Sequence, residues 1–318
     1  MKLIKYFLLS CLLLFSPMYS YQVTPNQTAY EFFTLANHAF EKSEWIEVIK
    51  YSKIIIQKFP NTSFTKDALY YLGVSYFNLK DYDISNKYFT RYLKDDFNPK
   101  YFEEIMHYKY SIAHFFKNGA KKRMFDWKKG PKLADALEDA IAIFDEIIAS
   151  MPNHEIAIRS IFAKAELHFD QNDFKEAIST FESLVEKYEK HELAVESFIQ
   201  IQKVYLKQTT YRKQDPNVLE FAKLNIEKFK EMHSREEEKA KILEDMLLEM
   251  KEKYAKGFLE IAEFYEKSKK NDAAILYYSK ILESFPETES AKVAKSRFDK
   301  ISQSPLPKGR GLNREDHG

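Results

Sequence analysis

The sequence predicts an all-α protein, a right-handed solenoid built from about six helix pairs. Three observations support this fold class: amphipathic helical patterns along most of the chain, a set of small and aromatic positions that recurs, and the absence of strand-like alternation. The composition agrees, since 45% of residues are hydrophobic, 31% are charged and only 7 are glycine. In a solenoid each helix pair packs only on its neighbours, so chain length does not set a number of domains.

The clearest copy of the pattern is Lys66–Pro99, which is expected to form two amphipathic helices, the second of which ends before Pro99. Leu69, Leu72, Gly73 and Tyr76 follow the i, i+3, i+4, i+7 spacing of one helix face. A glycine within a helix favours the close approach of a neighbouring helix. The order Leu-x2-Leu-Gly-x2-Tyr, followed by small-x3-Phe, is that of a 34-residue tetratricopeptide repeat.

Two marker positions identify six repeats between Ala29 and Ile301. The first marker is mostly small, and the second lies on the next helix, twelve residues later in the four repeats that have no insertion. In three repeats a proline follows the second marker by twelve residues and is expected to end the helix: Pro60, Pro152 and Pro286. A generic helical bundle, the alternative, does not explain this recurrence. The first markers are Ala36, Gly73, Ala113, Ala165, Gln202 and Ala262, and the second are Val48, Ser85, Ala140, Ala177, Ala222 and Ala274.

The repeats and the segments between them divide the chain into six parts. Repeats three and five carry insertions between their helices, the second of them at about 208–217. A charged helix, about 234–254, leads into the last repeat and is supported by the i,i+4 pairs Glu237/Lys241 and Glu249/Lys253. The expected parts are a signal peptide (1–20), N-terminal repeats (21–116), a basic-aromatic insertion (117–135), middle repeats (136–233), the charged helix with the last repeat (234–301) and a disordered tail (302–318).

The N-terminus has the features of a secretory signal. Lys2 and Lys5 precede a nearly all-apolar run at 6–15, and cleavage is expected after Ser20. In the alternative, the residues before Cys11 act as a lipobox and Cys11 is lipidated. Because Cys11 is the only cysteine, the exported chain has no intramolecular disulfide, and its stability must come from packing between repeats.

No motif in the sequence predicts catalysis, a cofactor or a metal site. The 7 glycines are dispersed, so no phosphate-binding loop is expected. None of the 8 histidines has an i,i+4 partner, and His107 and His114 lie seven residues apart, too far for one metal ion. The net charge of +1 gives no reason to expect nucleic acid. The sequence therefore indicates a protein-binding protein that is not an enzyme.

Aromatic residues occupy the positions expected to line a binding groove. In tetratricopeptide proteins, positions 5 and 12 of the first helix face the concave surface, and seven of the first eight such places are aromatic here. An exposed Phe forgoes about 1.5–3 kcal/mol of burial, so an open aromatic groove would indicate a partner peptide. On that basis, removing the Tyr70 and Phe77 rings is expected to weaken partner binding with little loss of stability. The alternative is that neighbouring repeats or the insertions cover these rings. The predicted groove residues are Phe33, Phe40, Tyr70, Phe77, Tyr110, Phe162 and Phe169.

The insertion of the third repeat has the composition of a membrane-surface segment. Five basic residues within 121–129 surround two aromatic residues, which suits a layer of lipid headgroups. The alternative is a solvated loop whose aromatic residues pack on the repeat. The candidate membrane or partner contacts are Lys121, Lys122, Arg123, Phe125, Trp127, Lys128 and Lys129.

The first two repeats and the last one resemble the BamD-type outer-membrane β-barrel assembly factors. The resemblance rests on segments 29–36, 58–61, 92–99 and, most closely, 260–288, with its Asp-Ala-Ala-Ile-Leu-Tyr-Tyr run and Phe-Pro exit. The middle repeats and the weak lipobox depart from that family. The first two repeats are also similar to periplasmic adaptors of cell-wall or division machinery, which gives a second hypothesis. A hydrolase grafted onto repeats is the third.

The resemblance implies a function and a location. Members of the family are periplasmic lipoproteins at the inner face of the outer membrane. They bind the barrel-inserting subunit through C-terminal repeats, here 258–285, and are thought to recognise unfolded outer-membrane proteins through N-terminal ones. The implied substrate contacts are Phe33, Phe40, Tyr70 and Phe77.

Overall fold

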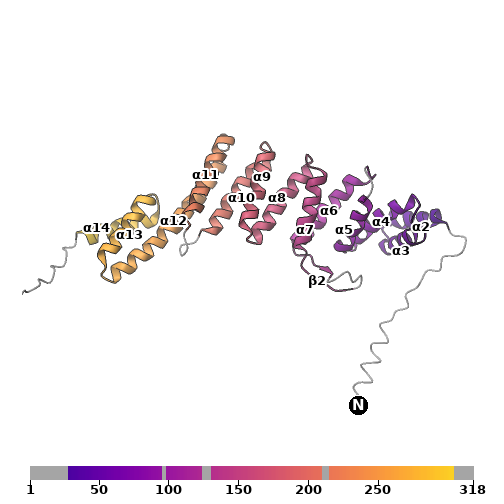
Figure 1. Ribbon diagram of the computed structural model, residues 1–318, viewed down its shortest axis with the longest axis horizontal. Coiled ribbons are helices and arrows are strands. Elements are labelled where there is room, and N and C mark those ends of the chain that lie inside the picture. The colour runs from indigo at the N-terminus through magenta and orange to yellow at the C-terminus, as the bar shows by residue number, and fades with distance from the viewer. Residues whose placement is uncertain (1–27, 95–97, 124–129, 210–214, 304–318) are drawn as a thin grey trace, which may run out of the picture. The chain divides into compact units, whose positions relative to one another are not determined.

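The computed structural model describes residues 28–94, 98–123, 130–209 and 215–303. Within these ranges the predicted fold class is confirmed: the chain is an all-α solenoid of paired helices (Figure 1). The expected signal peptide with Cys11, the residues Phe125, Trp127, Lys128 and Lys129, and the tail from 304 onward lie outside the described residues.

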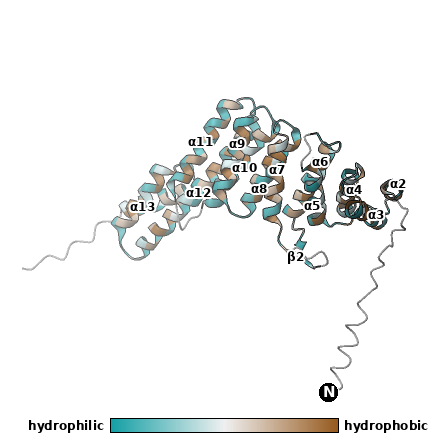
Figure 2. Ribbon diagram, turned by 45° about the vertical axis from the view of Figure 1, so that its right-hand side comes forward, coloured by the Kyte–Doolittle hydropathy of each residue, from teal (hydrophilic) through white to brown (hydrophobic). Residues whose placement is uncertain are grey.

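Thirteen helices and two short strands make up the described part of the chain. Consecutive helices form six pairs, from α2/α3 to α12/α13, and a single helix α14 follows them (Figure 1). Figure 2 shows that the helices carry both hydrophobic and hydrophilic residues, as amphipathic helices do. The elements are α2 (Ala29–Glu41), α3 (Trp45–Lys58), α4 (Phe64–Asn78), α5 (Tyr82–Leu93), α6 (Phe102–Lys117), β1 (Lys122–Arg123), β2 (Lys132–Ala134), α7 (Leu137–Ser150), α8 (Glu155–Asp170), α9 (Phe174–Lys187), α10 (Glu192–Gln208), α11 (Pro216–Met232), α12 (Glu237–Lys267), α13 (Asn271–Ser284) and α14 (Glu289–Ser302).

The chain forms two compact units, with a boundary inside α6. The first unit comprises residues 1–112 and 122–133, and the second comprises 113–121 and 134–318. The two insertions lie where the marker spacing indicated, between α6 and α7 and between α10 and α11. The first of them contains strands β1 and β2, which pair with each other. Strands of two and three residues are too short to show an alternating pattern in a sequence.

All twelve marker residues are buried, which explains why most of them are small. At the second repeat, the Ser85 hydroxyl donates a hydrogen bond of 2.7 Å to the backbone carbonyl of Gly73. Such a bond requires the two helices of the pair to come close together. The markers are therefore the contact points at which paired helices meet.

Gln202 is the one large first marker, and hydrogen bonds explain its burial. Its Nε2 donates to the carbonyl of Leu243 at 3.4 Å, and its Oε1 accepts from Asn225 Nδ2 at 3.0 Å. Asn225 Nδ2 also donates to the carbonyl of Phe198. A buried amide is tolerated when its polar atoms are paired, and this one links helices α10, α11 and α12.

The turn between the two helices of a repeat contains a left-handed residue at a fixed position, although the residue types there do not indicate it. In the four repeats without an insertion, the residue seven places after the first marker adopts a left-handed conformation: Ser43 (φ 59°), Lys80 (59°), Asn172 (64°) and Lys269 (60°). Only one of these residues is an Asn, which tolerates this conformation well, and none is a glycine. The tight helix–turn–helix connection, and not the local residue preference, therefore determines the backbone here.

The predicted helix stops are confirmed at all three prolines. Helices α3, α7 and α13 end two residues before Pro60, Pro152 and Pro286. The residue just before each proline has ψ between 48° and 53°, because the proline ring disfavours a helical conformation there. Tyr188 adopts the same conformation with no proline after it, so the repeat geometry alone is sufficient to end α9.

Helix α12 differs from the expectation. The charged segment and the first helix of the last repeat were expected as separate elements, but they form one helix of 31 residues. No proline interrupts the chain between them, and Glu and Lys are good helix formers; Gly257 at the junction lies within the helix and is buried. The Glu249–Lys253 pair is present at 3.0 Å. Among the described residues Glu237 and Lys241 form no ion pair, and Lys239 pairs with Glu236.

A carboxylate on α12 caps the last helix. Glu252 accepts hydrogen bonds from the backbone N–H of Glu289 (2.8 Å) and of Ser290 (3.2 Å), and from the Ser290 hydroxyl. The first N–H groups of a helix have no partner within it, so this carboxylate satisfies them and also complements the helix dipole. Lys251 forms an ion pair with Glu287 beside it.

Glu252→Gln is expected to destabilise the docking of α14 by about 1–2 kcal/mol, because a neutral amide accepts more weakly and its NH₂ group opposes the N–H donors. Amide hydrogen exchange in α14 should accelerate by roughly tenfold, while exchange in α2–α5 stays unchanged. Glu249→Gln, one turn away, serves as the control. Equal protection of α14 in both variants would contradict the capping role.

Candidate functional site

Of the seven predicted groove residues, Tyr70 is buried, with 5% of its surface exposed. Its ring stacks on Tyr101 with centroids 3.9 Å apart, and its hydroxyl donates to Glu104 Oε1 at 2.6 Å. Burial, and next this hydrogen bond, raise the pKa of Tyr70 far above its usual value. The prediction that this ring is open was wrong, and the alternative, that residues of the next repeat cover it, holds here.

The other six predicted rings are half-buried. Phe33, Phe40, Phe77 and Tyr110 lie in the first unit, as Tyr70 does, whereas Phe162 and Phe169 lie in the second. Phe162 packs edge-on against Phe181, and the Lys207 ammonium lies 4.6 Å from the centre of the Phe169 ring. The seven positions therefore do not form one uniform surface, and it is in the first unit that most of them gather.

The rings of the first unit form a continuous series that we call the aromatic ladder. Each ring contacts the next, with centroid distances of 6.1, 4.8, 6.1, 4.5, 6.3 and 3.9 Å. Aromatic pairs of this kind contribute about 0.5–1.5 kcal/mol each beyond the area that they bury. In contact order the ladder comprises Tyr30, Phe64, Phe33, Tyr71, Phe40, Tyr70 and Tyr101.

Hydrogen bonds hold the ladder in place. The Tyr71 hydroxyl donates to Asn37 Oδ1 at 2.6 Å, and Asn37 Nδ2 donates to Glu41 Oε1 at 2.9 Å. Burial raises the pKa of Tyr71 to about 12, and burial also raises the pKa of Asp67 above its usual value. At one end of the ladder the Tyr30 ring is 64% exposed. The ladder thus combines two buried rings, Tyr70 and Tyr71, with five fixed rings that are half-buried or exposed, and carboxylates lie beside them.

The basic insertion is attached to the first unit by ion pairs. Arg123 Nη1 contacts Asp83 Oδ1 at 2.8 Å, and Arg123 Nη2 contacts Asp81 Oδ2 at 2.8 Å. Lys132 also pairs with Asp81, and Lys121 pairs with Asp135. The side chain of Arg123 is only 11% exposed, so the prediction that it contacts a membrane was wrong. Asp81 and Asp83 lie 42 and 40 residues before it, which is why the sequence pattern did not show the pairing.

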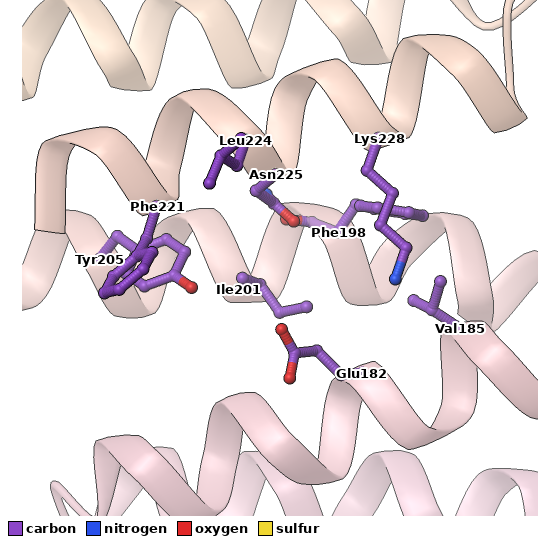
Figure 3. A pocket seen from close by; sticks show the side chains of 9 residues that line it. All are labelled: Glu182, Val185, Phe198, Ile201, Tyr205, Phe221, Leu224, Asn225 and Lys228. Carbon is purple, nitrogen blue, oxygen red and sulfur yellow. The ribbon is translucent and has the colours of Figure 1, made fainter. Parts of the chain in front are cut away.

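A pocket in the second unit was not predicted. It lies between helices α9, α10 and α11 (Figure 3). Its volume of about 160 Å³ is below the roughly 300–1,000 Å³ of cofactor sites, but it is similar to a cavity of about 150 Å³ that holds one benzene molecule. The pocket therefore suits one side chain. Its lining residues are Glu182, Val185, Phe198, Ile201, Tyr205, Phe221, Leu224, Asn225 and Lys228.

The floor of this pocket is apolar and its edges are polar. Ile201 and Tyr205 of α10 are buried, whereas Phe221 and Leu224 of α11 are 51% and 56% exposed. In Figure 3 the Glu182 carboxylate points from α9 towards Ile201. The sequence signal for this site was the pair of exposed apolar residues on α11, because five of the nine lining residues come from α9 and α10.

Within the described ranges, no group of three or more His, Cys, Asp or Glu side chains could hold a metal ion. In the same ranges, no helix combines the length and the apolar character needed to cross a membrane.

Comparison with known proteins identifies the repeats. Residues 67–96, 159–191 and 257–288 match a family model described as tetratricopeptide repeat. No curated protein matches the chain. Among solved structures, similar ones are a TPR repeats protein from Bacteroides fragilis (12% identity, 86% of this chain and 98% of that chain covered, TM-score 0.41) and residues 41 to the end of MamA from Desulfovibrio magneticus RS-1 (13%, 65% and 96%, 0.34). PilF from Pseudomonas aeruginosa is another (11%, 85% and 97%, 0.31).

The three matched segments correspond to the second, fourth and sixth helix pairs of the structure. With the buried markers at all six pairs, they show that this chain has the fold of a tetratricopeptide-repeat solenoid.

Proposed function

We propose that this protein is a non-catalytic scaffold of outer-membrane β-barrel assembly, which binds the barrel-inserting subunit and unfolded barrel proteins. Tetratricopeptide repeats are protein-binding modules, and the resemblance of the first two repeats and the last one to BamD-type factors supports this machinery. The aromatic ladder is the observation that carries the proposal, because it places a row of fixed rings on the first unit, five of which are half-buried or exposed.

The ladder suits the chemistry of an unfolded barrel strand. Such strands carry alternating apolar residues and aromatic girdle residues, and their backbone edges are unpaired. Partly exposed rings give edge-to-face contacts with aromatic side chains, and the carboxylates of Glu41 and Glu104 beside the ladder accept hydrogen bonds from donor groups. Rings already held by stacking lose little conformational entropy when a partner binds.

The last repeat supplies the proposed docking surface for the barrel-inserting subunit. Phe264 on α12 and Leu276 on α13 are 63% and 66% exposed, although most apolar residues of this repeat are buried or half-buried. Exposed apolar residues of this size are typical of protein contacts when they gather on one surface. We place the mature protein in the periplasm at the inner face of the outer membrane, with lipidated Cys11 or the docked partner as its anchor.

Depletion of the protein from its natural host is expected to lower the amount of folded outer-membrane barrels. Heat-modifiable electrophoretic mobility measures the folded fraction, and inner-membrane proteins serve as the control. Unchanged barrel levels would contradict the proposal. Co-purification with peptidoglycan-linked proteins, and not with the barrel-inserting subunit, would instead support the periplasmic adaptor.

A matched pair of variants tests the ladder itself. Tyr30 on α2 and Ile46 on α3 are both 64% exposed, so neither Tyr30→Asp nor Ile46→Asp should destabilise the fold strongly. In depleted cells, Tyr30→Asp is expected to restore barrel levels less well than Ile46→Asp, because it places a charge at the exposed end of the ladder. If both variants restored barrel levels equally, the ladder would not be part of the binding surface.

A further inference from the structure

The pocket between α9, α10 and α11 contains a carboxylate with no direct partner. Within the described residues, Glu182 makes no hydrogen bond or ion pair, and its charged neighbours are Lys228 and Glu186. Lys228 Nζ lies 3.9 Å from Glu186 Oε1, so the ammonium already has a carboxylate to pair with. The lining itself holds one carboxylate, Glu182, and one ammonium, Lys228; together with Glu186, which lies outside the lining and pairs with Lys228, these side chains carry a net charge of −1. A cationic partner group is complementary to this charge.

A cation beside the Glu182 carboxylate would stabilise its charged form. Burial raises the pKa of Glu182 above its usual value, and Glu186 acts in the same direction while Lys228 opposes it. Glu182 is an exposed residue, so its carboxylate loses only part of its hydration, but it gains no hydrogen bond in return, and this destabilises its charged form. A charge-assisted hydrogen bond from a partner would replace the lost hydration.

Aromatic rings form a second part of the pocket. Tyr205 and Phe221 stack with centroids 6.3 Å apart and an interplanar angle of 30°. Elsewhere in the second unit, the chain covers such rings with its own cations: Lys207 lies over Phe169 and Phe174, and Lys280 lies over Phe258. Among the described residues, no cation lies over the Phe221 ring, which is 51% exposed. The face of this ring is therefore available to a cation from outside.

We propose that this pocket binds an arginine side chain of a partner protein. The guanidinium group would form a bidentate hydrogen bond with Glu182 and stack on Phe221, and the methylene groups would lie over Ile201 and Leu224. Arginine suits this combination better than lysine, because its planar group matches a carboxylate and an aromatic face at the same time. The pocket volume of about 160 Å³ is sufficient for one such side chain.

Titration of the full chain with N-acetyl-L-arginine amide tests the proposal. The methyl resonances of Val185, Ile201 and Leu224 report on the pocket, and those of Ile46 and Leu276 lie elsewhere. We expect saturable shifts at the three pocket methyl groups only. The citrulline derivative, which has the same shape but no charge, is expected to bind at least tenfold more weakly. Equal binding of citrulline, or no saturable shift with arginine, would overturn the proposal.

Variants separate the charge from the rings. Glu182→Gln is expected to weaken arginine binding at least fivefold, and Phe221→Leu about threefold, whereas Glu176→Gln, at an exposed position of the same helix outside the pocket, should change it less than twofold. Lys228→Gln should strengthen binding, because it removes a competing cation. An unchanged affinity in Glu182→Gln, or tighter binding of N-acetyl-leucine amide than of the arginine derivative, would instead identify an apolar anchor site. The methyl spectra also show whether each variant is folded.

This inference is independent of the proposed function. The pocket lies in the middle repeats, away from the segments that carry the resemblance to barrel-assembly factors. Failure of arginine binding would leave the depletion experiment unaffected, and failure of that experiment would leave the pocket as a binding site for another partner.

Discussion

Gly73→Ala is expected to lower the free energy of unfolding of the first unit by about 3 kcal/mol. A Cβ atom at this position would lie 2.5 Å from Phe89 Cδ1 and closer still to Cε1. The Phe89 ring is fully buried, so it cannot move aside without disturbing its surroundings. Helix propensity alone predicts the opposite sign, a gain of about 1 kcal/mol for alanine over glycine. Urea unfolding followed by the fluorescence of the first unit measures the difference.

A double-mutant cycle shows whether the clash is the cause. Phe89→Val lacks the ring atoms that would meet the new methyl group, although it costs stability itself. In the Phe89→Val background, Gly73→Ala is expected to be neutral or stabilising by up to about 1 kcal/mol. A loss of the same size in both backgrounds would mean that the glycine is needed for another reason.

Tyr70→Ala is expected to destabilise the first unit by about 3–5 kcal/mol, the usual cost of removing a buried aromatic side chain. This reverses the expectation from the repeat pattern, in which the ring was open and its loss left stability unchanged. Tyr70→Phe keeps the stacking on Tyr101 and removes only the hydrogen bond to Glu104, so it should cost about 1 kcal/mol.

The melting temperature of the first unit measures both changes. Phe77→Ala, at a half-buried position of the same helix, provides the comparison and should cost less than Tyr70→Ala. If Tyr70→Ala leaves the melting temperature unchanged and weakens partner binding, the ring is exposed in solution and the groove is open there.

The repeat architecture could be predicted because its signals are local. The small markers, the helix ends at prolines and the 3.6-residue periodicity each depend on residues at most twelve positions apart in the chain. Burial of all twelve markers and the helix ends at Pro60, Pro152 and Pro286 agree with that prediction. The left-handed turn residues could not be predicted, because Ser43, Lys80 and Lys269 have no preference for that conformation.

The candidate sites depended on contacts that no local pattern encodes. Tyr70 is covered by residues 31 and 34 positions later, and the carboxylate that caps α14 comes from 37 residues earlier. Whether an outward-facing ring is exposed, or a cation free, depends on which side chains the next repeat brings against it. The sequence alone thus determined the helix pairs and their order, whereas tertiary packing decided which rings stay open and which carboxylates stay unpaired, because each repeat completes the surface of its neighbour.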